Sequence, residues 1–224
     1  MTIRVLVADD QAMIRAGFRM VLGGEEDIDV VAEAANGREA VERAARFHPD
    51  VVLMDIRMPE VDGLEATRRI LAADRAARVL ILTTFDLDEY IYEALAIGAS
   101  GFVLKDDPPE QLIAAIRTVA AGDALLSPTI TKRVIKAFSR VPRPTRPKVL
   151  DELSDRERAV FRLIARGLSN GEIGRELFIS ETTVKMHVTH ILQKLNLRDR
   201  VQAVVFAYRT GAFTDDGADG PGRA

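Results

Sequence analysis

The sequence predicts an α/β fold with a doubly wound, five-stranded parallel sheet, followed by a small all-α domain of four helices. Three observations support this class. Short apolar runs rich in β-branched residues alternate with helical periodicity over residues 1–125. Residues 150–212 show repeated helix-start signals. A basic, proline-rich stretch separates the two parts, and 224 residues suffice for two domains of ordinary size.

The strand candidates are IRVLVA, IDVVAE, DVVLMD, VLILTT and GFVL, in chain order. Their apolar residues are continuous rather than alternating, which indicates strands buried on both faces of a parallel sheet. Helical spacing between them predicts crossover helices and a doubly wound sheet, for which we expect the flavodoxin-like strand order 2-1-3-4-5. We expect the fifth helix to have Asp107 as its N-cap, Pro108 in its first turn and Glu110 completing a capping box.

Charge divides the chain in the same place as composition. Residues 1–130 hold 13 Lys/Arg against 23 Asp/Glu, whereas residues 131–149 hold 7 Lys/Arg and no acid. A polyanion should therefore meet the rear half of the chain. The predicted boundaries are 1–125 for the α/β domain, 126–149 for a short helix and a basic Pro-rich linker, 150–212 for the all-α domain and 213–224 for a disordered tail.

Composition also limits the chemistry. The chain has no cysteine and three scattered histidines, which argues against disulfides, thiolate nucleophiles and a structural zinc site. The first residues, MTIRVLVADD, turn acidic by position 9 and do not look like a signal peptide. No apolar run is long enough to span a membrane. We therefore expect a cytoplasmic protein that does not bind membranes.

Polar residues end four of the five apolar runs. Asp9 and Asp10 follow the first run, Asp55 the third, Thr83 the fourth and Lys105 the fifth. Each has an ordinary structural explanation on its own, but parallel strands bring their carboxyl ends to one edge, where these side chains would share a pocket. Crowded carboxylates without histidine or cysteine favour Mg²⁺. Asp55 could then attack a phosphoryl group, with Lys105 and Thr83 binding the product.

The segments VADD, VLMDIRMPEVDGLEA, VLILTTFD and GASGFVLKDD together resemble the receiver domain of two-component response regulators. The resemblance implies that Asp55 is the phosphoacceptor and that the protein is not an enzyme. It implies that Asp9 and Asp10 form the acidic pocket, with Asp10 the direct Mg²⁺ ligand and the backbone carbonyl of Arg57 another. An aspartyl-phosphate phosphatase, the enzymatic alternative, would carry a general-acid aspartate where Arg57 stands.

The resemblance also implies a switch made of Thr83 and Lys105. Phe102 stands where many relatives carry a tyrosine whose ring moves with the threonine. Because phenylalanine has no hydroxyl, any coupling through Phe102 would act by packing.

The rear domain shows clear helix starts. Ser154 with Glu157 and Ser169 with Glu172 form two S-x-x-E capping boxes, and Ser180 can cap a third helix. A tight turn around residues 178–180 gives the spacing of a helix-turn-helix. In the following helix one face is apolar, formed by Val184, Val188, Ile191, Leu192 and Leu195. The opposite face offers hydroxyl, amide, thioether and cationic groups, which suit a helix in the major groove of DNA.

Residues 150–211 resemble the LuxR-type DNA-binding domain, and together with the receiver they resemble the NarL/FixJ family. The resemblance implies that residues 181–195 form the recognition helix. Base contacts would come from Lys185, Met186 and Thr189. Phosphate contacts would come from Thr182, Thr183, His190 and Lys194.

The implied partners are a sensor histidine kinase, double-stranded promoter DNA, RNA polymerase and a second copy of the chain when Asp55 is phosphorylated. A small, weakly basic domain needs paired half-sites for useful affinity, which favours a homodimer on DNA. The linker could contact DNA phosphates or the acidic domain, and the sequence leaves both open. The other function considered is a regulator that uses the receiver as a dimerisation scaffold without phosphorylation.

Overall fold

The computed structural model describes residues 2–83, 88–122 and 148–212. The chain divides into two compact units, Met1–Ile130 and Thr131–Ala224, which are described separately below. The predicted helix between residues 130 and 138, most of the Pro-rich linker and the predicted disordered tail lie outside the described residues.

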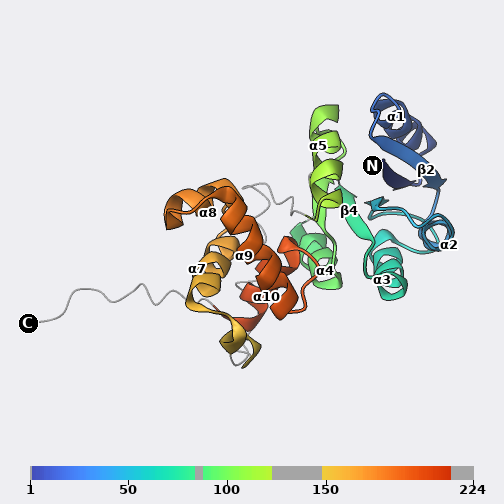
Figure 1. Cartoon of the computed structure of the whole chain (residues 1–224). Helices are drawn as coiled ribbons and strands as arrows, with labels where there is room; N and C mark the ends of the chain where they lie inside the picture. Colours follow the sequence, from blue (N-terminus) through green and yellow to red (C-terminus); the bar gives the residue numbers. More distant parts are fainter. Residues whose placement is uncertain (1, 84–87, 123–147, 213–224) are drawn as a thin grey trace, which may run out of the picture. The chain divides into compact units, whose positions relative to one another are not determined.

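The first unit contains a five-stranded parallel sheet, and this confirms the predicted fold (Figure 1). Its strands are β1 (Ile3–Ala8), β2 (Ile28–Ala34), β3 (Val51–Asp55), β4 (Arg78–Thr83) and β5 (Gly101–Leu104). They lie in the order β2-β1-β3-β4-β5, which is the predicted 2-1-3-4-5 arrangement. The apolar runs form these strands because both faces of the sheet are covered, so every position in β3 is buried.

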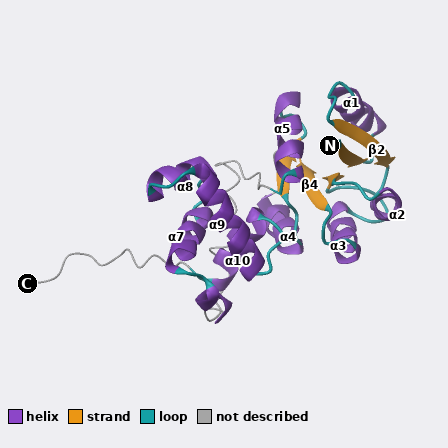
Figure 2. Cartoon of the chain, in the orientation of Figure 1, coloured by secondary structure: helices purple, strands orange, loops and turns teal. Residues whose placement is uncertain are grey.

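Five helices cover the sheet, drawn in purple around the orange strands in Figure 2. They are α1 (Ala12–Leu22), α2 (Gly37–Phe47), α3 (Gly63–Ala73), α4 (Asp88–Ile97) and α5 (Pro109–Ala120). Residues of α1 and α5 such as Leu22 and Ile116 pack with Val5, Leu53 and Leu80 in one buried cluster. Helices α2 and α3 lie side by side (Figure 1).

The predicted start of α5 is wrong by one residue. Pro108 is the N-cap and makes no side-chain cap bond, so the expected capping box is absent. The Asp107 carboxylate instead accepts the backbone N–H of Leu104 at 3.0 Å and closes the turn after β5. A local turn therefore takes the side chain that the sequence pattern assigned to the helix.

The second unit is all-α in its described part, as predicted. Its elements are the 3₁₀ helix η1 (Lys148–Glu152), α7 (Asp155–Ala165), α8 (Asn170–Leu177), α9 (Glu181–Lys194) and α10 (Arg200–Thr210). Both predicted capping boxes, at the starts of α7 and α8, are confirmed, and Ser180 caps α9. Phe178 takes a left-handed conformation at φ 55°, which makes the turn between α8 and α9.

In the part of the chain that the structure describes, every helix is too short or too polar to cross a membrane.

Candidate functional site

The acceptor candidate Asp55 is the last residue of β3 and is 6% exposed. Helix α3 begins unusually close to this strand end, because the Gly63 N–H donates to Ile56 O at 2.9 Å. A Cβ at position 63 would collide with the backbone carbonyl of Asp55. The absence of a side chain at position 63 therefore lets α3 begin this close to the backbone of Asp55.

Asp9 and Asp10 lie where β1 ends. Asp9 is fully buried, whereas Asp10 is exposed. The Asp9 N–H donates to Ala34 O at 3.1 Å, and Asp9 Oδ1 accepts the N–H of Gln11 at 2.9 Å. These bonds leave Asp9 Oδ2 directed into the pocket, where Lys105 approaches.

Lys105 joins the two buried carboxylates. Its Nζ lies 2.7 Å from Asp9 Oδ2 and 3.1 Å from Asp55 Oδ1, and its side chain is 9% exposed. Burial alone would lower the pKa of Lys105, but the two carboxylates raise it above its ordinary value, so the ammonium form persists at neutral pH. Burial raises the pKa of Asp55, and Lys105 offsets this only in part.

The donor set fits a hard cation. One carboxylate oxygen from each of Asp9, Asp10 and Asp55 lies within 4.8 Å of the others. Asp9 Oδ2 is buried and accepts no hydrogen bond of regular geometry from the described residues. Lys105 Nζ contacts it as an ion-pair partner. Three carboxylates facing one ammonium leave excess negative charge, which suits Mg²⁺. Arg57 follows two residues after Asp55 with an exposed side chain, and the ligand role of its carbonyl stays a prediction.

Two of the three predicted switch residues, Thr83 and Phe102, are buried. Thr83 ends β4 at 6% exposure and is paired in register with Leu104, and its carbonyl accepts the N–H of Lys105 at 2.9 Å. Phe102 on β5 is 2% exposed and is aligned with Ile81. The backbone therefore links Thr83 directly to Lys105, while the role of Phe102 in switching stays a prediction.

The second unit presents α9 as the helix that follows the turn. The predicted apolar face is confirmed for Val184, Val188, Ile191 and Leu195, which are all buried, whereas Leu192 is half-buried. The opposite face is exposed and carries Thr182, Lys185, Met186, Thr189, His190 and Gln193. Met186 is 50% exposed, which is high for a large apolar side chain and fits a surface that another molecule covers.

Two of the predicted phosphate contacts have partners within the domain. Lys194 Nζ lies 2.7 Å from Glu157 Oε2 and donates to Glu152 O at 3.2 Å. Thr183 Oγ1 lies 2.8 Å from the hydroxyl of Ser180. Both side chains therefore hold α9 in place, and a DNA contact from either stays a prediction.

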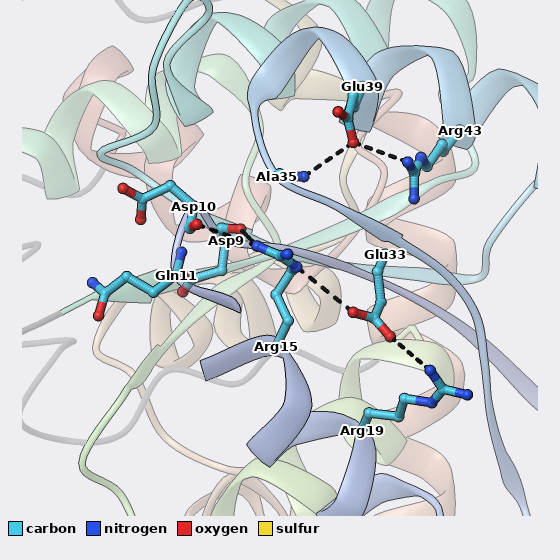
Figure 3. A network of polar contacts seen from close by, with 9 residues as sticks. All are labelled: Asp9, Asp10, Gln11, Arg15, Arg19, Glu33, Ala35, Glu39 and Arg43. Atoms are coloured by element: carbon cyan, nitrogen blue, oxygen red, sulfur yellow. Dashed lines mark hydrogen bonds and ion pairs between the residues drawn. The ribbon is translucent and has the colours of Figure 1, made fainter. Parts of the chain in front are cut away.

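Arg15 is a further residue beside the acidic pocket that the sequence pattern did not indicate. The Nη1 atom of Arg15 donates to the carbonyls of Asp9 at 2.8 Å and Asp10 at 3.2 Å, and the residue forms an ion pair with Glu33 (Figure 3). A signal was available, because Arg15 lies in the first turns of α1, where the helix dipole disfavours a cation.

The two units define a class of protein: a regulator that combines an acidic phosphoacceptor-type pocket with a helix-turn-helix DNA-binding domain. Residues 5–117 match the response regulator receiver domain family, and residues 151–207 match the family of bacterial regulatory proteins of the luxR type. The chain therefore belongs to the response regulators with a LuxR-type DNA-binding domain, and it is a transcription regulator. The resemblance predicted from the motifs is confirmed.

Known proteins resemble the chain along most of their length. The uncharacterized transcriptional regulatory protein YxjL of Bacillus subtilis (strain 168) is 44% identical over 210 residues, covering 93% of this chain and 96% of that protein. The nitrate/nitrite response regulator protein NarL of Escherichia coli (strain K12) is 38% identical, covering 93% and 96%. The crystal structure of the response regulator ChrA, from a heme-sensing two-component system, has a TM-score of 0.52 at 36% identity, covering 95% and 99%.

Proposed function

We propose that phosphorylation of Asp55 by a sensor histidine kinase controls DNA binding by this response regulator. The observation that carries the proposal is the position of Lys105, whose ammonium lies 2.7 Å from Asp9 and 3.1 Å from Asp55 and whose side chain is 9% exposed. A buried lysine that contacts two carboxylates is placed to pair with a phosphoryl group attached to one of them. Asp55 is the nucleophile, because it ends the central strand and faces this lysine.

Asp9, Asp10 and Asp55 would hold Mg²⁺, with Asp10 as a direct ligand and the Arg57 carbonyl as a further one. The exposed Asp10 side chain is accessible to a hydrated ion. Bound Mg²⁺ supplies neutralisation of the charge that develops on the phosphoryl oxygens. The residues of the chain orient the acceptor: Gly63 fixes the backbone beside Asp55, and Lys105 keeps the carboxylate turned into the pocket.

Phosphorylation adds about −1.5 to −2 charges to the pocket. Lys105 then pairs with the phosphoryl oxygens, and the Thr83 hydroxyl donates to them, with Phe102 repacking as Thr83 moves. The new contacts favour a receiver state that dimerises, which is a shift of an existing equilibrium. The predicted domain boundaries fit this division of labour, since the charge and the acceptor lie in residues 1–125 and the DNA-binding helix lies in residues 150–212.

DNA contacts come from the exposed face of α9. Lys185, Met186 and Thr189 read bases, while Thr182, Thr183, His190 and Lys194 contact phosphates. A solved relative by fold, the two-component response regulator RcsB, is described in a complex with DNA, at 22% identity and a TM-score of 0.57. We propose promoter DNA and RNA polymerase as partners of this chain, a dimer on paired half-sites and a cytoplasmic location.

The test is phosphate-dependent DNA binding. The full chain is incubated with Mg²⁺ and acetyl phosphate, and its mass, oligomeric state and affinity for DNA half-sites are measured. We expect wild type to gain one phosphoryl group, dimerise and bind DNA more tightly, and Asp55→Ala to do none of these. Asp29→Ala is a matched control, because Asp29 is an exposed aspartate near the amino end of β2, away from the carboxyl edge.

The scaffold alternative gives a different result in the same experiment. If wild type and Asp55→Ala take up no phosphate and bind DNA equally well, the receiver is a dimerisation scaffold and the proposed switch is wrong.

A further inference from the structure

We propose that Arg15 is a positioning residue that fixes the turn carrying Asp9 and Asp10, and that it thereby sets the affinity of the pocket for Mg²⁺. The inference rests on the proposed function of that pocket. Arg15 Nη1 donates to the backbone carbonyls of Asp9 at 2.8 Å and Asp10 at 3.2 Å. Its Nε lies 3.6 Å from Glu33 Oε2 on β2. In Figure 3 the guanidinium of Arg15 bridges the turn and Glu33.

The other bonds of this turn hold different atoms. The Asp9 N–H is tied to Ala34 O, and the Asp9 carboxylate to the N–H of Gln11. Gln11 is the N-cap of α1 but makes no side-chain cap bond, so the usual support for the start of a helix is missing here. Arg15 does not replace a cap, because it donates hydrogen bonds and accepts none, but it holds the two residues before the helix by binding their carbonyls. Both carbonyls belong to residues whose carboxylates face the pocket, so fixing them fixes the metal ligands.

The placement of Arg15 contrasts with that of Arg19, one turn further along α1. Both pair with Glu33, but the Arg19 side chain is 72% exposed and the Arg15 side chain is 17% exposed. A cation near a helix N-terminus is unfavourable, and burying its side chain adds a desolvation cost. The two carbonyls and Glu33 offset these costs for Arg15, which indicates a role in binding the turn rather than a surface ion pair.

The sign of the change in Mg²⁺ affinity when Arg15 is removed distinguishes two roles for this residue. If the guanidinium acted on the pocket by charge alone, its removal would strengthen Mg²⁺ binding, since like charges repel. If it holds the ligands in place, its removal weakens binding, as loss of groups that orient metal ligands usually does by about 10- to 100-fold.

The first experiment titrates ¹⁵N-labelled full chain with MgCl₂ and follows the amide shifts of residues 9–11. We expect Arg15→Ala to raise the dissociation constant about tenfold. Arg15→Lys, which keeps the charge and can reach a carbonyl, should recover part of the loss. Arg19→Ala is the matched control and should stay within about twofold of wild type, because its ion pair is exposed. Binding by Arg15→Ala as tight as in wild type, or tighter, would overturn the proposal.

A second measurement needs no metal. Hydrogen exchange of the Gln11 amide, which is bonded to Asp9 Oδ1, should be about tenfold faster in metal-free Arg15→Ala and unchanged in Arg19→Ala. Glu33→Gln should give a smaller change that disappears in the Arg15→Ala background, since Glu33 acts on the turn through Arg15. If Glu33→Gln changes the exchange rate equally in wild type and in Arg15→Ala, Glu33 does not act through Arg15. If Arg15→Ala fails to fold, the single variant Glu33→Gln still tests the proposal: it should speed exchange of the Gln11 amide, whereas Arg19→Ala, which removes the other partner of Glu33, should not. No change in Glu33→Gln would then overturn the proposal.

Labelling with acetyl phosphate distinguishes a failure of the proposed role of Arg15 from a failure of the proposed phosphorylation of Asp55. Arg15→Ala should need about tenfold more Mg²⁺ for half-maximal labelling, with the maximal rate little changed. A wild type that binds no Mg²⁺ and accepts no phosphate refutes the proposed function itself. If wild type binds Mg²⁺ and accepts phosphate, and Arg15→Ala is labelled equally well at every Mg²⁺ concentration, only the role of Arg15 is refuted.

Discussion

Replacing Glu157 by glutamine should destabilise the DNA-binding domain in a pH-dependent way. Glu157 is 5% exposed and lies 2.7 Å from Lys194, and its carboxylate also accepts the N–H of Ser154. Burial alone would raise the pKa of Glu157, but Lys194 and Ser154 lower it from 4.5 to about 2. Glutamine can still accept from Ser154 in a capping box, so the substitution removes mainly the charge interaction with Lys194.

The expected loss in the free energy of unfolding follows from the pKa shift of Glu157. At about 1.36 kcal/mol per pKa unit, a shift from 4.5 to about 2 corresponds to about 3.4 kcal/mol. Lys194 is 39% exposed, so solvent screens the pair, and we expect a loss of about 1 to 2 kcal/mol at pH 7. Because the folded-state pKa is depressed, this stabilisation is present above about pH 4.5 and is lost as the pH falls toward 2.

The assay is urea unfolding of the full chain at pH 7, 5, 4 and 3, followed by the NMR signals of α9. Glu176→Gln is the control, because Glu176 pairs with Arg166 at 3.6 Å with both side chains about half exposed. The control should lose less than about 0.5 kcal/mol. The reasoning is refuted if Glu157→Gln is no less stable than the control at pH 7, or if its deficit is as large at pH 3 as at pH 7.

Three further substitutions test the fold and the DNA surface. Gly63→Ala should cost the receiver about 2 kcal/mol or more because its Cβ meets the Asp55 carbonyl, whereas Gly17→Ala, with nothing within 4 Å, should be neutral or stabilising in thermal unfolding. Ser169→Ala should lower the urea stability of the second domain by about 1 kcal/mol through loss of the α8 cap, and an unchanged midpoint would contradict this. Met186→Ala should weaken specific DNA binding about fivefold without lowering the melting temperature, and equal affinity in a fluorescence-anisotropy titration would remove Met186 from the interface.

The sequence predicted those features that local patterns encode. Short, continuous apolar runs rich in β-branched residues are typical of strands in a sheet covered on both faces, so the pattern predicted the strands, and the doubly wound class supplied their order. The capping boxes at Ser154 and Ser169 depend on residues three positions apart, and both are present. The parallel topology brings the strand ends to one edge, so the proximity of Asp9, Asp55 and Lys105 could be predicted without the conformation of the loops.

Long-range polar contacts were not predictable in the same way. Lys194 pairs with Glu157, 37 residues away, and lysine on the flank of a DNA-binding helix suggests a phosphate contact just as well. Asp107 had two partners within reach, the start of α5 and the N–H of Leu104, and periodicity does not rank them. Such choices depend on where each backbone group points after folding, and a one-dimensional pattern does not contain that direction.

The ammonium group of Lys194 has a mechanical consequence. It binds the carbonyl of Glu152 in η1 as well as the carboxylate of Glu157 at the start of α7, while its own backbone forms the last turn of α9. The Lys194 side chain therefore links η1, at the start of the described part of this unit, directly to the end of α9. A displacement of η1 would thus be transmitted to α9 through this contact, beside the one between Arg158 and the Asp151 carbonyl.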